Sequence, residues 1–105
     1  MTFDVIGERY SILFKNPQAI AQVLSVQKGE SQATIPNGKL VKGQVSYNLP
    51  WSWHIDPEDV SMAEMTIELY DGLPSHVEQD LDYWLNTVKR FAPWQAKIVD
   101  MKDYR

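Results

Sequence analysis

Residues 48–72 read NLPWSWHIDPEDVSMAEMTIELYDG, and the interpretation of the remaining sequence depends on them. The stretch holds two tryptophans, one histidine and six carboxylates, so it is either a binding site or a pair of strands rich in polar residues. Apolar and polar residues alternate over residues 50–56 and again over 60–71, which is typical of half-buried strands. The acidic segment DPED at residues 56–59 predicts a turn. We therefore expect a hairpin here.

A tight turn in this hairpin places opposed residues on the same face of the sheet. The residues predicted on one face are large aromatics and carboxylates: Trp51, Trp53, Glu64, Glu68 and Tyr70. His54 and Asp56 are predicted on the other face, with the apolar residues of the second strand. A register slip of one residue exchanges the two faces.

The flanking sequence supplies the remaining elements. Asn16 followed by Pro17 is typical of a helix start, and Gly29 of a helix end. Apolar residues at helical spacing predict a second helix over residues 75–91. Further segments are predicted as follows: strands over 10–14, 39–47 and 94–101, a turn region over 30–39 with Pro36-Asn37-Gly38 at its sharpest point, and a loose segment over 1–9.

The predicted order is strand, helix, three strands, helix and strand, in a single domain over residues 10–105. Helices set among antiparallel strands indicate the α+β class, as a two-layer sandwich with both helices on one face of an antiparallel sheet. This arrangement is close to a ferredoxin-like fold with one added strand. The other sheet face is open or meets a partner, and homodimerisation through it is one alternative.

The composition excludes several functional classes. A chain of 105 residues with 44% hydrophobic and 23% charged residues predicts one globular domain. The absence of cysteine excludes disulfides and thiolate chemistry, and it fits a cytoplasmic protein. A net charge of -4 with scattered basic residues argues against nucleic acid and anionic membranes as partners. No apolar run approaches the ~20 residues that cross a bilayer.

Three functions remain open. The first is a small binding or regulatory module, in which an aromatic and acidic sheet face binds a protein segment or a small ligand. The second is a calcium-linked domain, because Asp56, Glu58 and Asp59 offer oxygen ligands in one turn, although their spacing is not that of an EF-hand. The third is a hydrolase-type enzyme with His54 as general base, which no nucleophile or cofactor motif accompanies.

Several short motifs resemble one known family. They are YNLPWSWHIDP at residues 47–57, EMTIE at 64–68, HVE at 76–78 and PW at 93–94. Together they resemble the BP-seventy-four N-terminal domain family, whose bacterial members are sometimes labelled calmodulin-like. The resemblance implies one set of ligand-binding positions, which are Trp51, Trp53, His54, Asp56, Glu64, Glu68 and Trp94.

Overall fold

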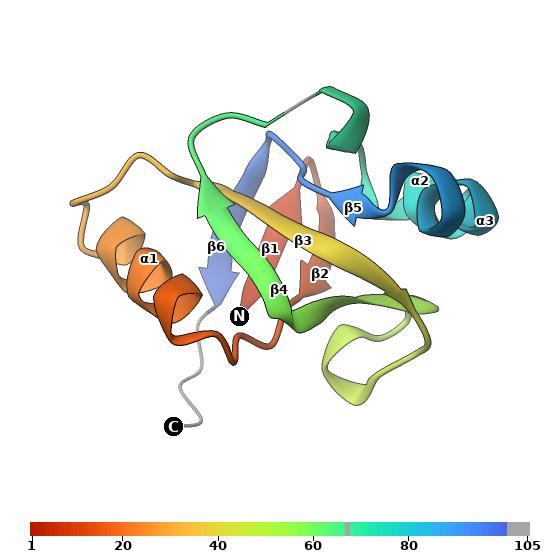
Figure 1. Cartoon of the computed structure of the whole chain (residues 1–105), viewed down its shortest axis with the longest axis horizontal. Helices are drawn as coiled ribbons and strands as arrows, with labels where there is room; N and C mark the ends of the chain where they lie inside the picture. The colour runs from red at the N-terminus through yellow and green to blue at the C-terminus, as the bar shows by residue number, and fades with distance from the viewer. Residues whose placement is uncertain (67, 101–105) are drawn as a thin grey trace.

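The computed structural model describes residues 1–66 and 68–100, and its strands form two three-stranded antiparallel sheets. The first sheet has the order β2-β1-β6, built from β1 (Thr2–Val5), β2 (Glu8–Ser11) and β6 (Ala96–Asp100). The second has the order β4-β3-β5, built from β3 (Ile35–Lys42), β4 (Trp53–Ala63) and β5 (Arg90–Phe91). In Figure 1 the long strands β3 and β4 cross in front of the first sheet.

The helices lie at opposite sides of the two sheets (Figure 1). They are α1 (Pro17–Gln27), α2 (Pro74–Gln79) and α3 (Leu81–Tyr83), with 3₁₀ turns η1 (Ser46–Asn48) and η2 (Glu68–Tyr70) and a π-helical turn η3 (Trp84–Val88). The start of α1 confirms its prediction, because Asn16 Oδ1 accepts the Gln18 N–H at 2.9 Å and Pro17 follows the cap. No helix among the described residues is long and apolar enough to cross a membrane.

The α+β class is confirmed, but the described strands do not form a ferredoxin-like sandwich. Helix α1 packs against β4, whereas α2 packs against β2, so the helices do not share one sheet face. A split βαβ unit contains parallel strands, and every pairing among the described strands is antiparallel. The predicted helix over residues 75–91 is also divided, since Asp80 has φ −131° and ψ 49° between α2 and α3.

The prediction of a loose segment over residues 1–9 is wrong. Strand β1 is the centre of the first sheet, because it pairs with β2 on one side and with β6 on the other. Phe3 and Val5 are buried in the core. A four-residue strand is too short to show a clear period in the sequence, and its partner β6 lies near the other end of the chain.

The predicted hairpin turn over residues 56–59 is an irregularity within one long strand. Strand β4 continues through this segment and pairs with β3 on both sides of it, at Leu40↔Ile55 and at Gly38↔Val60. Only Lys39 on β3 therefore faces the whole of residues 56–59. The Glu58 N–H does bond to Asp56 Oδ1 at 2.9 Å, so the local turn forms as a bulge without reversing the chain.

Gly38 also lies inside a strand, where the sequence predicted the sharpest point of a turn. A Cβ atom at this position would collide with Ile55 Cγ2 and would lie 3.2 Å from Val60 Cγ2. Glycine is required here because β3 and the bulged β4 approach each other closely, and not because the chain turns.

Aromatic rings fill the space between the two sheets. The ring centroid of Tyr10 lies 5.7 Å from that of Phe3, 5.7 Å from that of Trp53 and 5.2 Å from that of Phe91. Trp53 and Phe91 meet edge to face at 5.5 Å. Trp53 is 0% exposed, so the prediction that it lies on an open sheet face is wrong.

A buried side-chain amide connects the two sheets. Asn48 is 1% exposed, and its Oδ1 accepts the Ser11 N–H at 2.7 Å. Its Nδ2 donates to the Trp53 carbonyl oxygen at 2.8 Å. Ser11 ends β2 in the first sheet and Trp53 begins β4 in the second, so one side chain satisfies a backbone group in each.

We expect Asn48→Ala to lower the free energy of unfolding by about 2–4 kcal/mol, because it leaves the Ser11 N–H and the Trp53 carbonyl without partners. Urea denaturation followed by circular dichroism measures this loss. Asn86→Ala, at an exposed position, is the control and should change stability by less than about 0.5 kcal/mol. Equal stability of the two variants would show that Asn48 is not a structural link.

Tyr10→Phe should leave stability unchanged or raise it, since the buried Tyr10 hydroxyl has no hydrogen-bond partner among the described residues. Burial raises the pKa of Tyr10 well above its ordinary value of 10.0. Above that pH the unfolded chain releases this proton and the folded chain keeps it. As the pH rises, the free energy of unfolding of the wild type should therefore fall by about 1.4 kcal/mol per pH unit through this one group. Tyr10→Phe should lack that contribution.

Unfolding curves between about pH 8 and pH 11.5 test this expectation. A residual alkaline slope is expected in the variant, because burial and then the charge of Asp56 raise the pKa of Tyr47 as well. If Tyr10→Phe lowers the free energy of unfolding by more than about 1 kcal/mol at neutral pH, the expectation is contradicted, because the Tyr10 hydroxyl would then have a partner.

Candidate functional site

The structure separates the seven residues that the sequence grouped as one binding set. Trp51 and Trp53 stack with their ring centroids 6.0 Å apart. The Trp51 Nε1–H donates to the Arg9 carbonyl oxygen at 2.8 Å, which ties this ring to β2. Both tryptophans therefore help to hold the sheets together, and Trp53 has no exposed surface to offer a ligand.

His54 lies on the outer side of the second sheet, opposite Val41. Its Nδ1 is 2.9 Å from the Gly43 carbonyl oxygen. A carbonyl oxygen only accepts, so this contact places the proton of the neutral ring on Nδ1 and leaves Nε2 without one. No carboxylate is hydrogen-bonded to His54 within residues 1–66 and 68–100, so the Gly43 carbonyl orients the ring there and not an acidic side chain.

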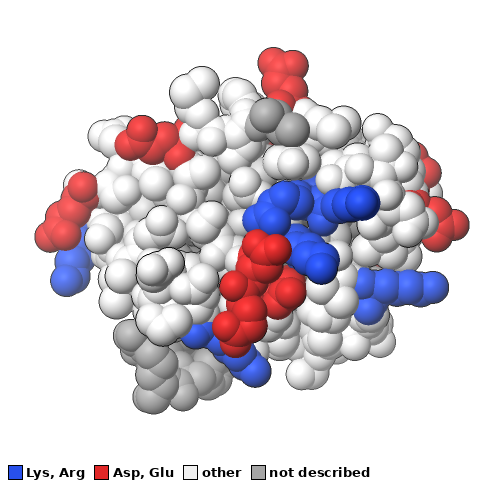
Figure 2. Space-filling model, in the orientation of Figure 1, with Lys and Arg blue, Asp and Glu red and all other residues white. Residues whose placement is uncertain are grey.

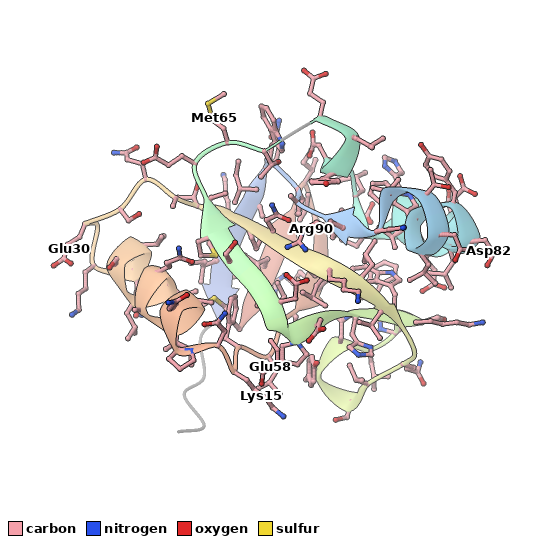
Figure 3. All side chains as sticks on the ribbon, viewed as in Figure 1. Lys15, Glu30, Glu58, Met65, Asp82 and Arg90 are labelled. Atoms are coloured by element: carbon pink, nitrogen blue, oxygen red, sulfur yellow. The ribbon has the colours of Figure 1, made fainter. Side chains whose placement is uncertain are left out.

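The carboxylates of Asp56, Glu58 and Asp59 do not converge. Asp56 bonds to the Glu58 N–H, and Asp59 Oδ1 is paired with Arg90 Nη1 at 3.0 Å. Figure 2 shows acidic and basic side chains next to one another on this face, and Figure 3 places Arg90 at its centre. In the described part of the chain, no group of three or more His, Asp or Glu side chains is placed to hold a metal ion. The geometry thus gives no support to a calcium site in this bulge.

Glu64, Glu68 and Trp94 lie at the other end of the molecule. Strand β4 ends at Ala63, so the two glutamates do not share a sheet face with the other tryptophans. Both glutamates are exposed and have no ion pair among the described residues. We call Glu64 and Glu68 the acidic rim.

Exposed apolar side chains gather at the same end. We call these four side chains the apical surface. Their exposed fractions are 67% for Ile6, 77% for Met65, 50% for Leu69 and 37% for Trp94. Val5 pairs with both Glu8 and Ala96, so the turn at Ile6 and the turn at Trp94 lie at one end of the first sheet. Figure 1 shows these turns under the loop that follows β4, and Figure 3 labels Met65 on that loop.

The loop that carries the acidic rim is fixed to the segment before β6. The Trp94 Nε1–H donates to Thr66 Oγ1 at 2.8 Å, and the Ala92 N–H donates to the Tyr70 carbonyl at 2.9 Å. Asp71 Oδ1 accepts the Trp94 N–H at 2.8 Å and the Gly72 N–H at 2.9 Å. These bonds orient the indole ring of Trp94 while more than a third of its surface stays exposed.

Sequence reasoning missed three members of the apical surface. Met65 and Leu69 were assigned to the apolar face of a strand that in fact stops at Ala63. Ile6 fell in the segment predicted to be loose. Gly7 was the available local signal, because glycine is common in two-residue hairpin turns.

Thr66→Val should release the Trp94 ring with little change in shape, because valine has no acceptor for the indole N–H. We expect a stability loss of at most about 1 kcal/mol, since water can replace the lost partner at this exposed site. The indole N–H resonance of Trp94 should shift and exchange faster with water. Thr87→Val, at another exposed position, should leave that resonance in place; an unmoved resonance in Thr66→Val would contradict the bond.

Comparison with known proteins agrees with the sequence motifs. A family model described as the BP-seventy-four N-terminal domain matches residues 1–104. Searches of curated proteins and of solved structures find no significant match. The matched range includes both sheets, the apical surface and the acidic rim. This chain therefore belongs to the BP-seventy-four N-terminal domain family, as its Trp-Ser-x-His-x-Asp-Pro motif indicated.

Proposed function

We propose that this protein is a binding module whose apical surface takes up a protein segment carrying apolar and basic side chains. The proposal depends on one observation, the collection of four large, exposed apolar side chains at one end of the fold. Single exposed apolar residues are ordinary, but a group of them bordered by polar residues is typical of an interaction site.

The charges around the apical surface favour a basic partner. The acidic rim has no cation of its own among the described residues, and Figure 2 shows acidic rather than basic side chains along this edge. A lysine or arginine of the partner could pair with the rim or lie over the exposed ring of Trp94. The net charge of -4 would also attract such a segment at long range.

The same charges disfavour a homodimer through this surface. In a twofold dimer each surface patch meets its own copy, so the acidic rims would face each other. Like charges across an interface are unfavourable. A small ligand is disfavoured for a different reason: small-molecule sites enclose most of the ligand, whereas the apical side chains are between 37% and 77% exposed.

A random peptide library displayed on phage provides the test. We expect the wild-type protein to select peptides in which lysine or arginine lies close to large apolar residues. A selected peptide, measured by titration calorimetry, should bind the Met65→Ser/Leu69→Ser double variant at least about tenfold more weakly. This loss corresponds to about 1.4 kcal/mol, which is within reach of two lost apolar contacts.

Leu49→Ser is the matched control, because Leu49 is 60% exposed and lies beside η1, away from the apical surface. It should bind the peptide as the wild type does. Glu68→Gln should weaken binding mainly at low salt, where a rim charge acts most strongly. The proposal is wrong if the library yields no peptide, or if the double variant binds the selected peptide as tightly as the wild type.

A further inference from the structure

The turn between β1 and β2 contains a residue that does not suit its backbone. Val5 pairs with Glu8, so Ile6 and Gly7 are the two central residues of a hairpin turn. Their φ values are 51° and 89°, as in a type I′ turn, for which Asn-Gly is the preferred pair. Positive φ is strained for any residue with a Cβ atom and is a genuine outlier for a β-branched one.

The side chain of Ile6 also contributes little to the stability of the fold. Its side chain is 67% exposed and does not belong to the hydrophobic core. An asparagine would relieve the backbone strain and would replace apolar surface with a polar group that water solvates. Neither the turn nor the core thus explains an isoleucine at this position.

The other non-glycine residue at positive φ among the described residues has an ordinary explanation. Lys89, at φ 71°, directly follows the π-helical turn η3, where a left-handed residue commonly ends a helix. Its side chain is unbranched at Cβ and charged, so it suits an exposed position. Ile6 has no such role, and strained residues that nothing in the fold requires are found at binding sites.

We infer that Ile6 is a contact residue of the apical surface, kept at the hairpin tip because the partner segment covers its side chain with an apolar residue of its own. This inference rests on the proposed function and extends it, since it identifies the residue at which binding and stability conflict. Burial by the partner would remove the exposed apolar area of Ile6 from water, which favours binding. The rigid hairpin would hold the side chain in place before binding.

Ile6→Asn tests the conflict directly, because its two expected effects have opposite signs. The melting temperature should rise by about 5 °C, which is the size expected when a small domain loses the strain of one left-handed β-branched residue. The affinity for a peptide selected from the library should fall about tenfold. Ile6→Val keeps the branch at Cβ, the backbone strain and most of the apolar area. Its melting temperature and its affinity for the peptide should therefore stay close to those of the wild type.

A purely structural role for Ile6 would lower the melting temperature in Ile6→Asn, and that result overturns the inference. The inference is also overturned if Ile6→Asn is stabilised but binds the peptide as tightly as the wild type. In that case the proposed function still stands, provided that Met65→Ser/Leu69→Ser weakens binding. Failure of that double variant, or a library without any selected peptide, would instead remove the proposed function and this inference with it.

Discussion

The contact between the two sheets depends on the side-chain amide of Asn48. It accepts the Ser11 N–H from the end of β2 and donates to the Trp53 carbonyl at the start of β4. Ser11 follows Tyr10 directly, so the amide fixes the two strands whose rings meet with centroids 5.7 Å apart. An apolar side chain at position 48 would fill the space but would leave the partly buried Ser11 N–H and the buried Trp53 carbonyl unpaired. The aromatic core and the polar link therefore specify the same arrangement of the sheets.

Polar contacts around this link explain why residues 48–53 are so rich in aromatic and polar groups. The Trp51 indole donates to a β2 carbonyl, and the Ser52 N–H donates to a carboxylate oxygen of Glu78 on α2 at 2.6 Å. From β2, the Glu8 carboxylate accepts the Ser75 N–H at 2.8 Å. Residues 48–53 thus form a structural junction between the two sheets and α2. The later part of residues 48–72, around the acidic rim, contributes instead to the exposed apical surface.

Features that depend on neighbouring residues were predictable from the sequence, and features that depend on distant pairing were not. The cap at Asn16 and the end of α1 near Gly29 are local, and both were correct. The turn signal at residues 56–59 was also correct locally, but pairing with β3 on both sides kept the chain extended. The role of β1 depends on β6, far along the chain, and no local pattern reveals it. For the same reason the binding set mixed core residues such as Trp53 with exposed ones such as Trp94.

The buried core also determines how the apical surface is presented. Ile6 directly follows Val5, a core residue of β1, and Trp94 lies two residues before Ala96, the residue that pairs with Val5. Ile6 and Trp94 are therefore continuations of paired, buried strands, while the Thr66 and Asp71 bonds hold the loop of the acidic rim against Trp94. A surface fixed in this way loses little conformational entropy on binding. This end of the fold combines a hydrogen-bonded backbone with exposed apolar side chains, which distinguishes it from ordinary exposed loops. That combination is the physical reason to look for a binding partner there.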